Sequence, residues 1–279
     1  MRKSLRRTAV AVLILTALAL GGRAGVAQEK SKLDEVLARG KLIVGVTSEA
    51  PPFGFVDEKG ELVGFDIDIA RLIAKATFGD PAKIELFRQG FAARWPNVEN
   101  GTVDFGIQVT TVYADRAQKV AFTRPYIDSG IVVVVKQDSA IHSLADLNNP
   151  KYTVAHLTAP VQEERGKRLY PQAKFVTFDS IAAQFNAVKV GRADAAQLDA
   201  PVAWWYVKDN PDVRVLNEWL TDVTNNAIFL RAGDFKWWLY LDTLVAEMRG
   251  GSLFSEYSAI YKKWFAQVPP HAKYYLNHP

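Results

Sequence analysis

Short runs of β-branched and other apolar residues alternate with segments of helical periodicity along most of the 279-residue chain. The run at 41–46 is typical of a buried strand, and apolar residues recur at helical spacing over 65–74. Repeated pairs of this kind predict a largely parallel sheet with helices on both faces. We expect strands at 41–46, 84–87, 103–108, 120–123, 131–136, 152–155, 175–178, 193–198 and 226–230, and helices at 31–39, 65–74, 92–100, 161–169, 182–190, 202–208, 234–249 and 252–265.

The pattern forms two α/β series followed by a helical tail. The second series begins at Leu144, and neither an internal repeat nor a Ser/Gly-rich linker separates it from the first. In the tail, Asp234 is expected to cap a helix that runs to Arg249 and is stopped by Gly250 and Gly251, and Ser252 is expected to open the last helix. The sequence therefore predicts an α/β protein whose two units are not joined by a simple linker.

The first 27 residues have the pattern of a secretory signal peptide, with a basic stretch at 1–7 and a 15-residue apolar run at 8–22. The apolar run is shorter than the roughly 20 residues that a bilayer-spanning helix needs. We expect removal near Ala27–Gln28 and release into the periplasm. The segment holds five basic and no acidic residues, so its removal leaves 29 basic and 30 acidic residues and changes the net charge from +4 to −1. The basic pI is thus no argument for nucleic acid.

Motifs that would indicate catalysis or metal binding are absent from the sequence. It contains no cysteine, no phosphate-binding or dinucleotide-binding glycine loop and no nucleophile elbow, and its four histidines lack metal-ligand spacing. Asp66 and Asp68 lie two apart on a predicted helix and so do not share a face, which favours helix-start charges over a paired acid and base. We expect no enzyme activity, no metal and no cofactor.

Several segments match a known family in a fixed order along the chain. They are GKLIVGV at 40–46, PPFGF at 51–55, GELVGFDIDIA at 60–70, NGTVDF at 100–105, DR at 115–116, VAFTRPY at 120–126 and GRADA at 191–195. With these motifs the chain resembles the family-3 periplasmic solute-binding proteins, which serve polar and acidic amino acids through ABC importers. The resemblance spans essentially the whole mature chain.

The fold that the resemblance implies is a two-lobed clamp of the type II periplasmic-binding-protein class. Each lobe is expected to hold a mostly parallel sheet flanked by helices, with the ligand in the cleft between the lobes. Transferred to this chain, lobe 1 comprises 28–127 plus 225–279 and lobe 2 comprises 128–224, with hinge crossovers near 127–129 and 224–226. Closure around a ligand that contacts both lobes then shifts the population toward the closed state.

The resemblance also implies residues for the two charged groups of an amino acid. Arg116 matches the family's carboxylate-binding arginine, and a guanidinium fork can bind two oxygens at once. Thr110 and Thr111 lie just upstream at the family's hydroxyl position. Asp199 follows the GRADA motif at the spacing of the ammonium-binding aspartate, although an N-cap for the helix that follows is an alternative role for it.

Further pocket residues follow from the same comparison with the family. Phe91 matches an aromatic platform that covers the ligand, with an ordinary core aromatic as the alternative. Arg94 matches an arginine of relatives that bind acidic amino acids, with a solvated helix-face charge as the alternative. Thr47 and Ala50 stand where relatives have ligand-selecting residues. The segment 158–163 differs from the family's Gly-Thr-Thr helix start, and its Pro160 has no N–H to offer a ligand. We therefore expect an α-amino acid whose side chain is not simply that of glutamate or histidine.

These features predict a non-enzymatic, monomeric receptor that delivers an amino acid to an ABC permease in the inner membrane. A periplasmic dehydratase of the cyclohexadienyl type on the same fold is one alternative, with Glu49 and Glu163 as candidate acids. A ligand-sensing partner of a chemoreceptor is another, and it would use the same pocket.

Overall fold

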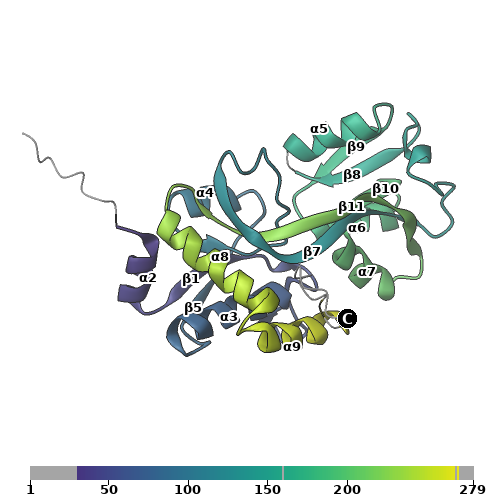
Figure 1. Ribbon diagram of the computed structural model, residues 1–279. Coiled ribbons are helices and arrows are strands. Elements are labelled where there is room, and N and C mark those ends of the chain that lie inside the picture. Colours follow the sequence, from purple (N-terminus) through teal and green to yellow (C-terminus); the bar gives the residue numbers. More distant parts are fainter. Residues whose placement is uncertain (1–29, 159, 268, 270–279) are drawn as a thin grey trace, which may run out of the picture. The chain divides into compact units, whose positions relative to one another are not determined.

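The computed structural model describes residues 30–158, 160–267 and 269, and the chain from Lys32 onward forms one compact unit (Figure 1). The signal peptide expected at 1–27 lies outside the described residues. The strands are β1 (Leu42–Val46), β2 (Glu49–Ala50), β3 (Gly54–Val56), β4 (Leu62–Val63), β5 (Ile84–Arg88), β6 (Phe105–Gly106), β7 (Val120–Lys136), β8 (Thr153–Leu157), β9 (Lys174–Phe178), β10 (Ala195–Asp199) and β11 (Val213–Arg231). The α-helices are α2 (Lys32–Arg39), α3 (Phe65–Phe78), α4 (Arg94–Glu99), α5 (Pro160–Leu169), α6 (Ile181–Lys189), α7 (Ala200–Lys208), α8 (Phe235–Gly250) and α9 (Phe254–Phe265), and η1 (Ala145–Leu147) is a 3₁₀ turn.

One eight-stranded sheet, in the order β5-β1-β6-β11-β7-β10-β8-β9, carries the fold. Its outer pairs are parallel, as expected: β1 with β5 and β6, and β8 with β9 and β10. Its centre is antiparallel, because β11 pairs with both β6 and β7 and β7 also pairs with β10. The sheet is therefore mixed, with the chain crossing its centre in opposite directions. A second, three-stranded sheet has the order β2-β3-β4.

The central strands β7 and β11 are much longer than the sequence predicts, at 17 and 19 residues. They run side by side across the middle of Figure 1. Pro125 lies in the break that the sequence predicts between residues 123 and 131. It pairs with Ala227, next to a register shift between Asn226 and Ala227, and a strand tolerates proline at such an irregularity. Across the same ribbon Asp128 pairs with Asn225, so the two expected crossovers are direct neighbours.

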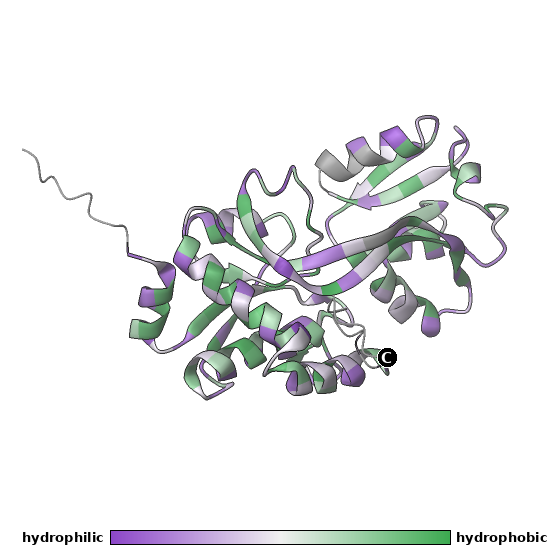
Figure 2. Ribbon diagram, in the orientation of Figure 1, coloured by the Kyte–Doolittle hydropathy of each residue, from purple (hydrophilic) through white to green (hydrophobic). Residues whose placement is uncertain are grey.

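The largest aromatic cluster of the core surrounds Phe65, the first residue of α3. Its ring centroid lies 5.0 Å from that of Phe265 and 6.1 Å from those of Phe53, Tyr126 and Tyr257. α3 packs on β1, β5 and α9, and Figure 2 shows hydrophobic residues along these strands and on the inner helix faces. Within the described ranges, no helix is long and apolar enough to cross a bilayer.

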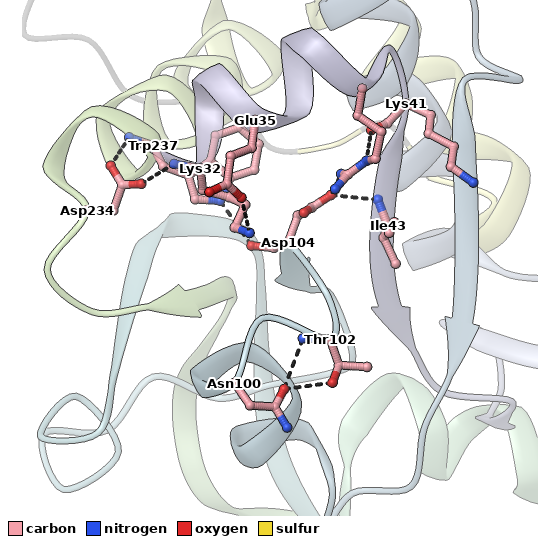
Figure 3. A network of polar contacts seen from close by, with 10 residues as sticks. Lys32, Glu35, Lys41, Ile43, Asn100, Thr102, Asp104, Asp234 and Trp237 are labelled. Carbon is pink, nitrogen blue, oxygen red and sulfur yellow. Dashed lines mark hydrogen bonds and ion pairs between the residues drawn. The ribbon is translucent and has the colours of Figure 1, made fainter. Parts of the chain in front are cut away.

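Two buried or half-buried carboxylates hold α2 against the rest of the molecule (Figure 3). Asp104 Oδ2 accepts a hydrogen bond from the N–H of Ile43 at 2.7 Å and also pairs with Arg39. Asp234 caps α8 as expected, accepting from the N–H of Trp237 at 3.0 Å, and its other oxygen accepts from the N–H of Lys32 at 2.6 Å. Ser252 does not open α9, because its hydroxyl donates to Glu247 and the helix begins two residues later.

Candidate functional site

A pocket of about 890 Å³, part of it open to solvent, lies at the carboxyl ends of two parallel strands. Leu157 ends β8 and Asp199 ends β10, and both line it. The carboxyl edge of such strands is where α/β proteins bind ligands. The lining residues are Phe91, Arg94, Val109, Thr111, Tyr113, Arg116, Ile131, Leu157, Leu169, Ile181, Gln184, Gln197, Leu198, Asp199 and Leu220.

Asp199 turns its carboxylate toward the two central strands. Oδ1 accepts from the hydroxyl of Ser129 on β7 at 2.7 Å, and Oδ2 accepts from Nδ2 of Asn226 on β11 at 3.3 Å. Burial raises the pKa of Asp199 from 3.8 to about 6, although these hydrogen bonds favour the charged form. The residue stands at the N-cap position of α7, yet its side chain accepts no hydrogen bond from the described backbone of that helix. The capping alternative is therefore wrong for the side chain.

Arg116 approaches the pocket from the segment that follows Thr111. Its Nη1 donates to the backbone oxygen of Thr111 at 2.7 Å, and the guanidinium lies over the rings of Tyr113, 5.0 Å from the centroid, and Trp95, 5.9 Å away. Contacts with two aromatic faces and a backbone carbonyl hold the planar guanidinium in place. A half-buried cation in this setting is suited to bind an anionic group of a ligand.

The segment that carries the two threonines is bonded to β11. The N–H of Ala227 donates to the backbone oxygen of Thr110 at 3.0 Å, and the hydroxyl of Thr111 donates to Oδ1 of Asn226 at 3.3 Å. Asn226 thus contacts both Thr111 and Asp199, so a single amide side chain connects the neighbourhoods of the two charged groups. Thr110 itself is buried beneath the wall and does not line the pocket.

Arg94 begins α4 and is 7% exposed, so it is not a solvated helix-face charge. Its guanidinium lies 4.3 Å from the ring centroid of Trp95 and 5.5 Å from that of Phe91, and Nη1 donates to the Thr110 hydroxyl at 3.5 Å. Nε is buried and has no hydrogen-bond partner among the described residues. Burial first, and the charge of Arg116 second, lower the pKa of Arg94 well below its usual value. A ligand acceptor would relieve this cost.

The structure therefore brings five of the six predicted residues into one pocket, namely Phe91, Arg94, Thr111, Arg116 and Asp199. Phe91 is partly buried against the core and also lines the pocket, so its position is compatible with both roles considered for it. Thr47 is buried and does not line the pocket. Glu49 is exposed on β2 outside the lining, and the side chain of Glu163 is outside the described structure. α5 begins at Pro160, where a missing N–H is tolerated, and Ala159 lies outside the described residues.

Sequence reasoning missed the functional environment of Asp66. This carboxylate is fully buried behind the pocket wall, where it accepts hydrogen bonds from the Tyr126 hydroxyl at 2.7 Å and from the N–H of Val109 at 3.0 Å. Burial raises its pKa from 3.8 to about 7 despite both bonds. Val109 lines the pocket with φ at 43°, a strained conformation for a β-branched residue, so Asp66 holds the wall in place. Asp68 points elsewhere, to Lys263 at 2.6 Å.

Gln184 is the second polar residue that the sequence did not reveal as part of the site. It is buried on α6, lines the pocket, and stands three residues after Ile181 and one before Phe185, both of which are buried. A polar residue at a core-facing helical position was the available signal. Its amide spans two strands, donating to the backbone oxygens of Ala155 and Gln197.

Comparison with known proteins shows the family of the chain. A family model described as bacterial extracellular solute-binding proteins, family 3, matches residues 42–267. A glutamine-binding protein of Geobacillus stearothermophilus is 36% identical over 187 residues, which cover 67% of this chain and 71% of the relative. The glutamine-binding protein of an ABC transporter in Bacillus subtilis is 28% identical over 263 residues, which cover 93% of this chain and 94% of the relative.

Solved structures give the same picture of the fold. An ancestral amino acid-binding protein, described as a precursor of cyclohexadienyl dehydratase, has a TM-score of 0.76 and 33% identity and covers 84% of this chain and 100% of its own. A solute receptor for L-cysteine of Neisseria gonorrhoeae has a TM-score of 0.78 and 27% identity and covers 86% of this chain and 95% of its own. These likenesses confirm the expected α/β fold class.

Proposed function

Because the chain belongs to the bacterial extracellular solute-binding proteins of family 3, we propose that it is a receptor that binds a free amino acid and delivers it to an ABC importer. The observation that carries this proposal is the presence of Arg116 and Asp199 in one pocket. A free amino acid is a zwitterion, and burying it requires a cation for its carboxylate and an anion for its ammonium group.

Each pocket residue then has a role in holding the ligand. Arg116 binds the α-carboxylate with its planar fork, and the hydroxyl of Thr111 stands beside it. Asp199 binds the ammonium group, which would favour the ionised carboxylate and so oppose the effect of burial on its pKa. Phe91 covers the ligand, and Arg94 faces its side chain with Thr110 as support.

Binding is coupled to closure of two lobes, which we assign to 28–127 plus 225–279 and to 128–224. The paired crossovers of β7 and β11 support this division, since Asp128 and Asn225 lie opposite each other in the ribbon. Asn226 supports the coupling, because it contacts Thr111 from one lobe and Asp199 from the other. A ligand held by both lobes stabilises the closed state through its higher affinity for that state.

The same proposal covers location and partners. Family membership supports export, with residues 1–27 acting as the signal peptide and the mature receptor working as a monomer in the periplasm. Its macromolecular partner is the permease of an ABC transporter in the inner membrane, and this is supported by relatives that are named as binding proteins of ABC transporters. Nucleic acid has no place in this function.

Calorimetric titration of the mature protein with the twenty amino acids tests the proposal. We expect one or a few to bind, and Arg116→Met and Asp199→Asn to weaken binding at least thirtyfold, since removal of one partner of a buried charge pair costs about 2–5 kcal/mol. Arg88→Met and Asp209→Asn, at exposed positions outside the pocket, serve as matched controls and should leave the affinity unchanged. Failure of every amino acid to bind, or equal losses in the control variants, would overturn the receptor proposal.

The proposed function is non-enzymatic, and the same preparation tests the dehydratase alternative. Asp199 is the one carboxylate among the described lining residues, and its hydrogen bonds to Ser129 and Asn226 suit an ion-binding role. The likeness to a precursor of cyclohexadienyl dehydratase makes the alternative worth testing. We expect no loss of prephenate or arogenate on incubation with the protein, and turnover that disappears in Asp199→Asn would establish an enzyme.

A further inference from the structure

One buried side chain of the pocket has no role in holding the head group of an amino acid. Gln184 is 1% exposed and lines the pocket from α6. Its Nε2 donates to the backbone oxygen of Ala155 at 2.9 Å and to that of Gln197 at 2.6 Å. Its Oε1 is buried and has no hydrogen-bond partner in the described part of the chain. Such an acceptor is rare in a folded protein, because nothing compensates for its lost hydration.

The orientation of this amide is fixed by the backbone. Ala155 lies on β8 and Gln197 on β10, two parallel neighbours in the sheet, and their carbonyl oxygens both require a donor. Turning the amide over would place Oε1 against these two oxygens and break both hydrogen bonds. The helix that carries it is anchored by its cap, where the Ser180 hydroxyl accepts from the N–H of Ala183 at 3.2 Å. Oε1 is therefore held as an acceptor beside the pocket.

The pocket lining around this acceptor is largely apolar. Apolar side chains from several segments make up much of the lining on the side of α5 and α6. They are Leu157, Leu169, Ile181, Leu198 and Leu220. The complementary donor comes from α4, where the buried guanidinium of Arg94 also has an unused N–H, on Nε. Gln197 also lines the pocket, and its Nε2 is a second buried donor with no hydrogen-bond partner among the described residues. Beyond the head-group residues, the pocket thus presents one acceptor, on Gln184, and two donors, on Arg94 and Gln197, whose hydrogen-bonding capacity is unfilled.

We propose that Gln184 selects the ligand by accepting a hydrogen bond from its side chain, and that the ligand is an α-amino acid whose side chain ends in a carboxamide. The inference rests on the proposed receptor function, in which Arg116 and Asp199 hold the head group. A carboxamide carries an N–H donor for Gln184 and a carbonyl acceptor for Arg94 on adjacent atoms. It therefore satisfies both buried groups at once.

Other side chains satisfy one buried group and conflict with the other. A carboxylate suits Arg94, but at neutral pH it has no donor for Oε1 of Gln184 and places lone pairs against it. A cationic side chain would donate to Gln184, but it would add positive charge beside Arg94, whose charged form is already disfavoured by burial and by Arg116. An apolar side chain leaves both groups unsatisfied.

The experiment compares four ligands by calorimetric titration of the mature protein, namely glutamine, asparagine, glutamate and methionine. Glutamate and methionine match glutamine in length. Glutamate lacks the side-chain N–H donor, and methionine has only a weakly accepting sulfur. We expect the wild-type protein to bind a carboxamide at least tenfold more tightly than glutamate or methionine, which is about 1.4 kcal/mol. In Gln184→Met the preference for carboxamide over methionine should fall at least tenfold.

A matched control separates selection from support of the helix. Asn186→Met changes an exposed amide two residues along α6 and should leave the preference unchanged. Gln184→Met also removes the hydrogen bonds to Ala155 and Gln197, which could loosen the pocket. The readout is therefore the ratio of the affinities for a carboxamide and for methionine, because a purely structural loss would weaken the binding of all ligands alike. The wild-type comparison requires no variant and remains decisive where Gln184→Met fails to fold.

The outcomes separate the two proposals. Binding of glutamate or a cationic amino acid in preference to both carboxamides would overturn the inference and leave the receptor function standing. An unchanged ratio in folded Gln184→Met would also overturn it. Absence of binding by any amino acid would instead refute the receptor function on which the inference rests.

Discussion

Removing the hydroxyl of Tyr126 should destabilise the protein more above pH 7 than below pH 5. The hydroxyl donates to Asp66 Oδ1 at 2.7 Å, and both side chains are fully buried. Burial raises the pKa of Asp66 from 3.8 to about 7, so its ionised form is the costly one in the folded state. The shift from 3.8 to about 7 corresponds to about 4 kcal/mol at 1.36 kcal/mol per pKa unit.

The sign of the pH dependence follows from proton uptake. Because the pKa of Asp66 is higher in the folded than in the unfolded state, its contribution to stability is fully present below pH 3.8 and is lost as the pH rises through about 7. A hydrogen bond to a charged group contributes about 1.5–3 kcal/mol and one to a neutral group about 0.5–1.5 kcal/mol. Tyr126→Phe should therefore lower the free energy of unfolding by about 1–2 kcal/mol more at high pH than at low pH.

Urea denaturation followed by circular dichroism, at about pH 5 and about pH 8.5, measures this difference. The Asp66→Asn background is the control, because the amide that replaces the carboxyl cannot ionise and the cost of Tyr126→Phe should there be the same at both pH values. An equal cost of Tyr126→Phe at both pH values in the otherwise wild-type protein would refute the reasoning, since the hydroxyl would then not distinguish the charged from the neutral carboxyl.

Two further variants probe packing and the pocket. Gly106→Ala should lower the free energy of unfolding in urea by about 1–3 kcal/mol, because the new Cβ would lie 2.0 Å from Phe229 Cζ, whereas Gly90→Ala meets no atom within 4 Å and should stay near the wild-type value. Equal stability of these two variants would contradict the packing argument. Ser129→Ala removes a hydrogen bond that favours ionised Asp199, so the pKa of that carboxyl should rise above about 6. Amino-acid affinity should then decline at a higher pH than in the wild-type protein, and an unchanged pH midpoint would exclude this role.

The charged residues of the pocket could be predicted from the sequence because their residue types stand at matching places among motifs that resemble a known family. Arg116, in the DR motif, and Asp199, after the GRADA motif, were assigned by their resemblance to the family, and the structure brings them into one pocket with Arg94. Their ligand roles stay predictions. Asp66 and Gln184 were not predictable in the same way, because a side chain becomes a buried, partnered group only through tertiary packing. Asp66 resembles an ordinary helix-start charge until Tyr126 and Val109 enclose it.

The central strands show the corresponding limit for the fold. Segments with uninterrupted apolar periodicity, such as β1 and α3, were predicted near their observed positions. β7 was predicted as two strands because Pro125 and Gly130 are typical of breaks, and the first half of β11 was missed. Long-range pairing between these strands, with register shifts that absorb the proline, overrides the local preference.

The place of β11 in the sheet also determines when the molecule can fold. Phe229 on β11 pairs with Gly106 on one side and with Phe122 on the other. β6 already has β1 on one edge, but its other edge lacks a partner until residues 213–231 have been made. Contacts between such distant residues form slowly, because a long loop must close first. The first half of a growing chain therefore ends in an unpaired strand edge, and the sheet is completed only late in synthesis. Under the export that we propose, such a delay would keep the chain in a form that can still be threaded across the membrane.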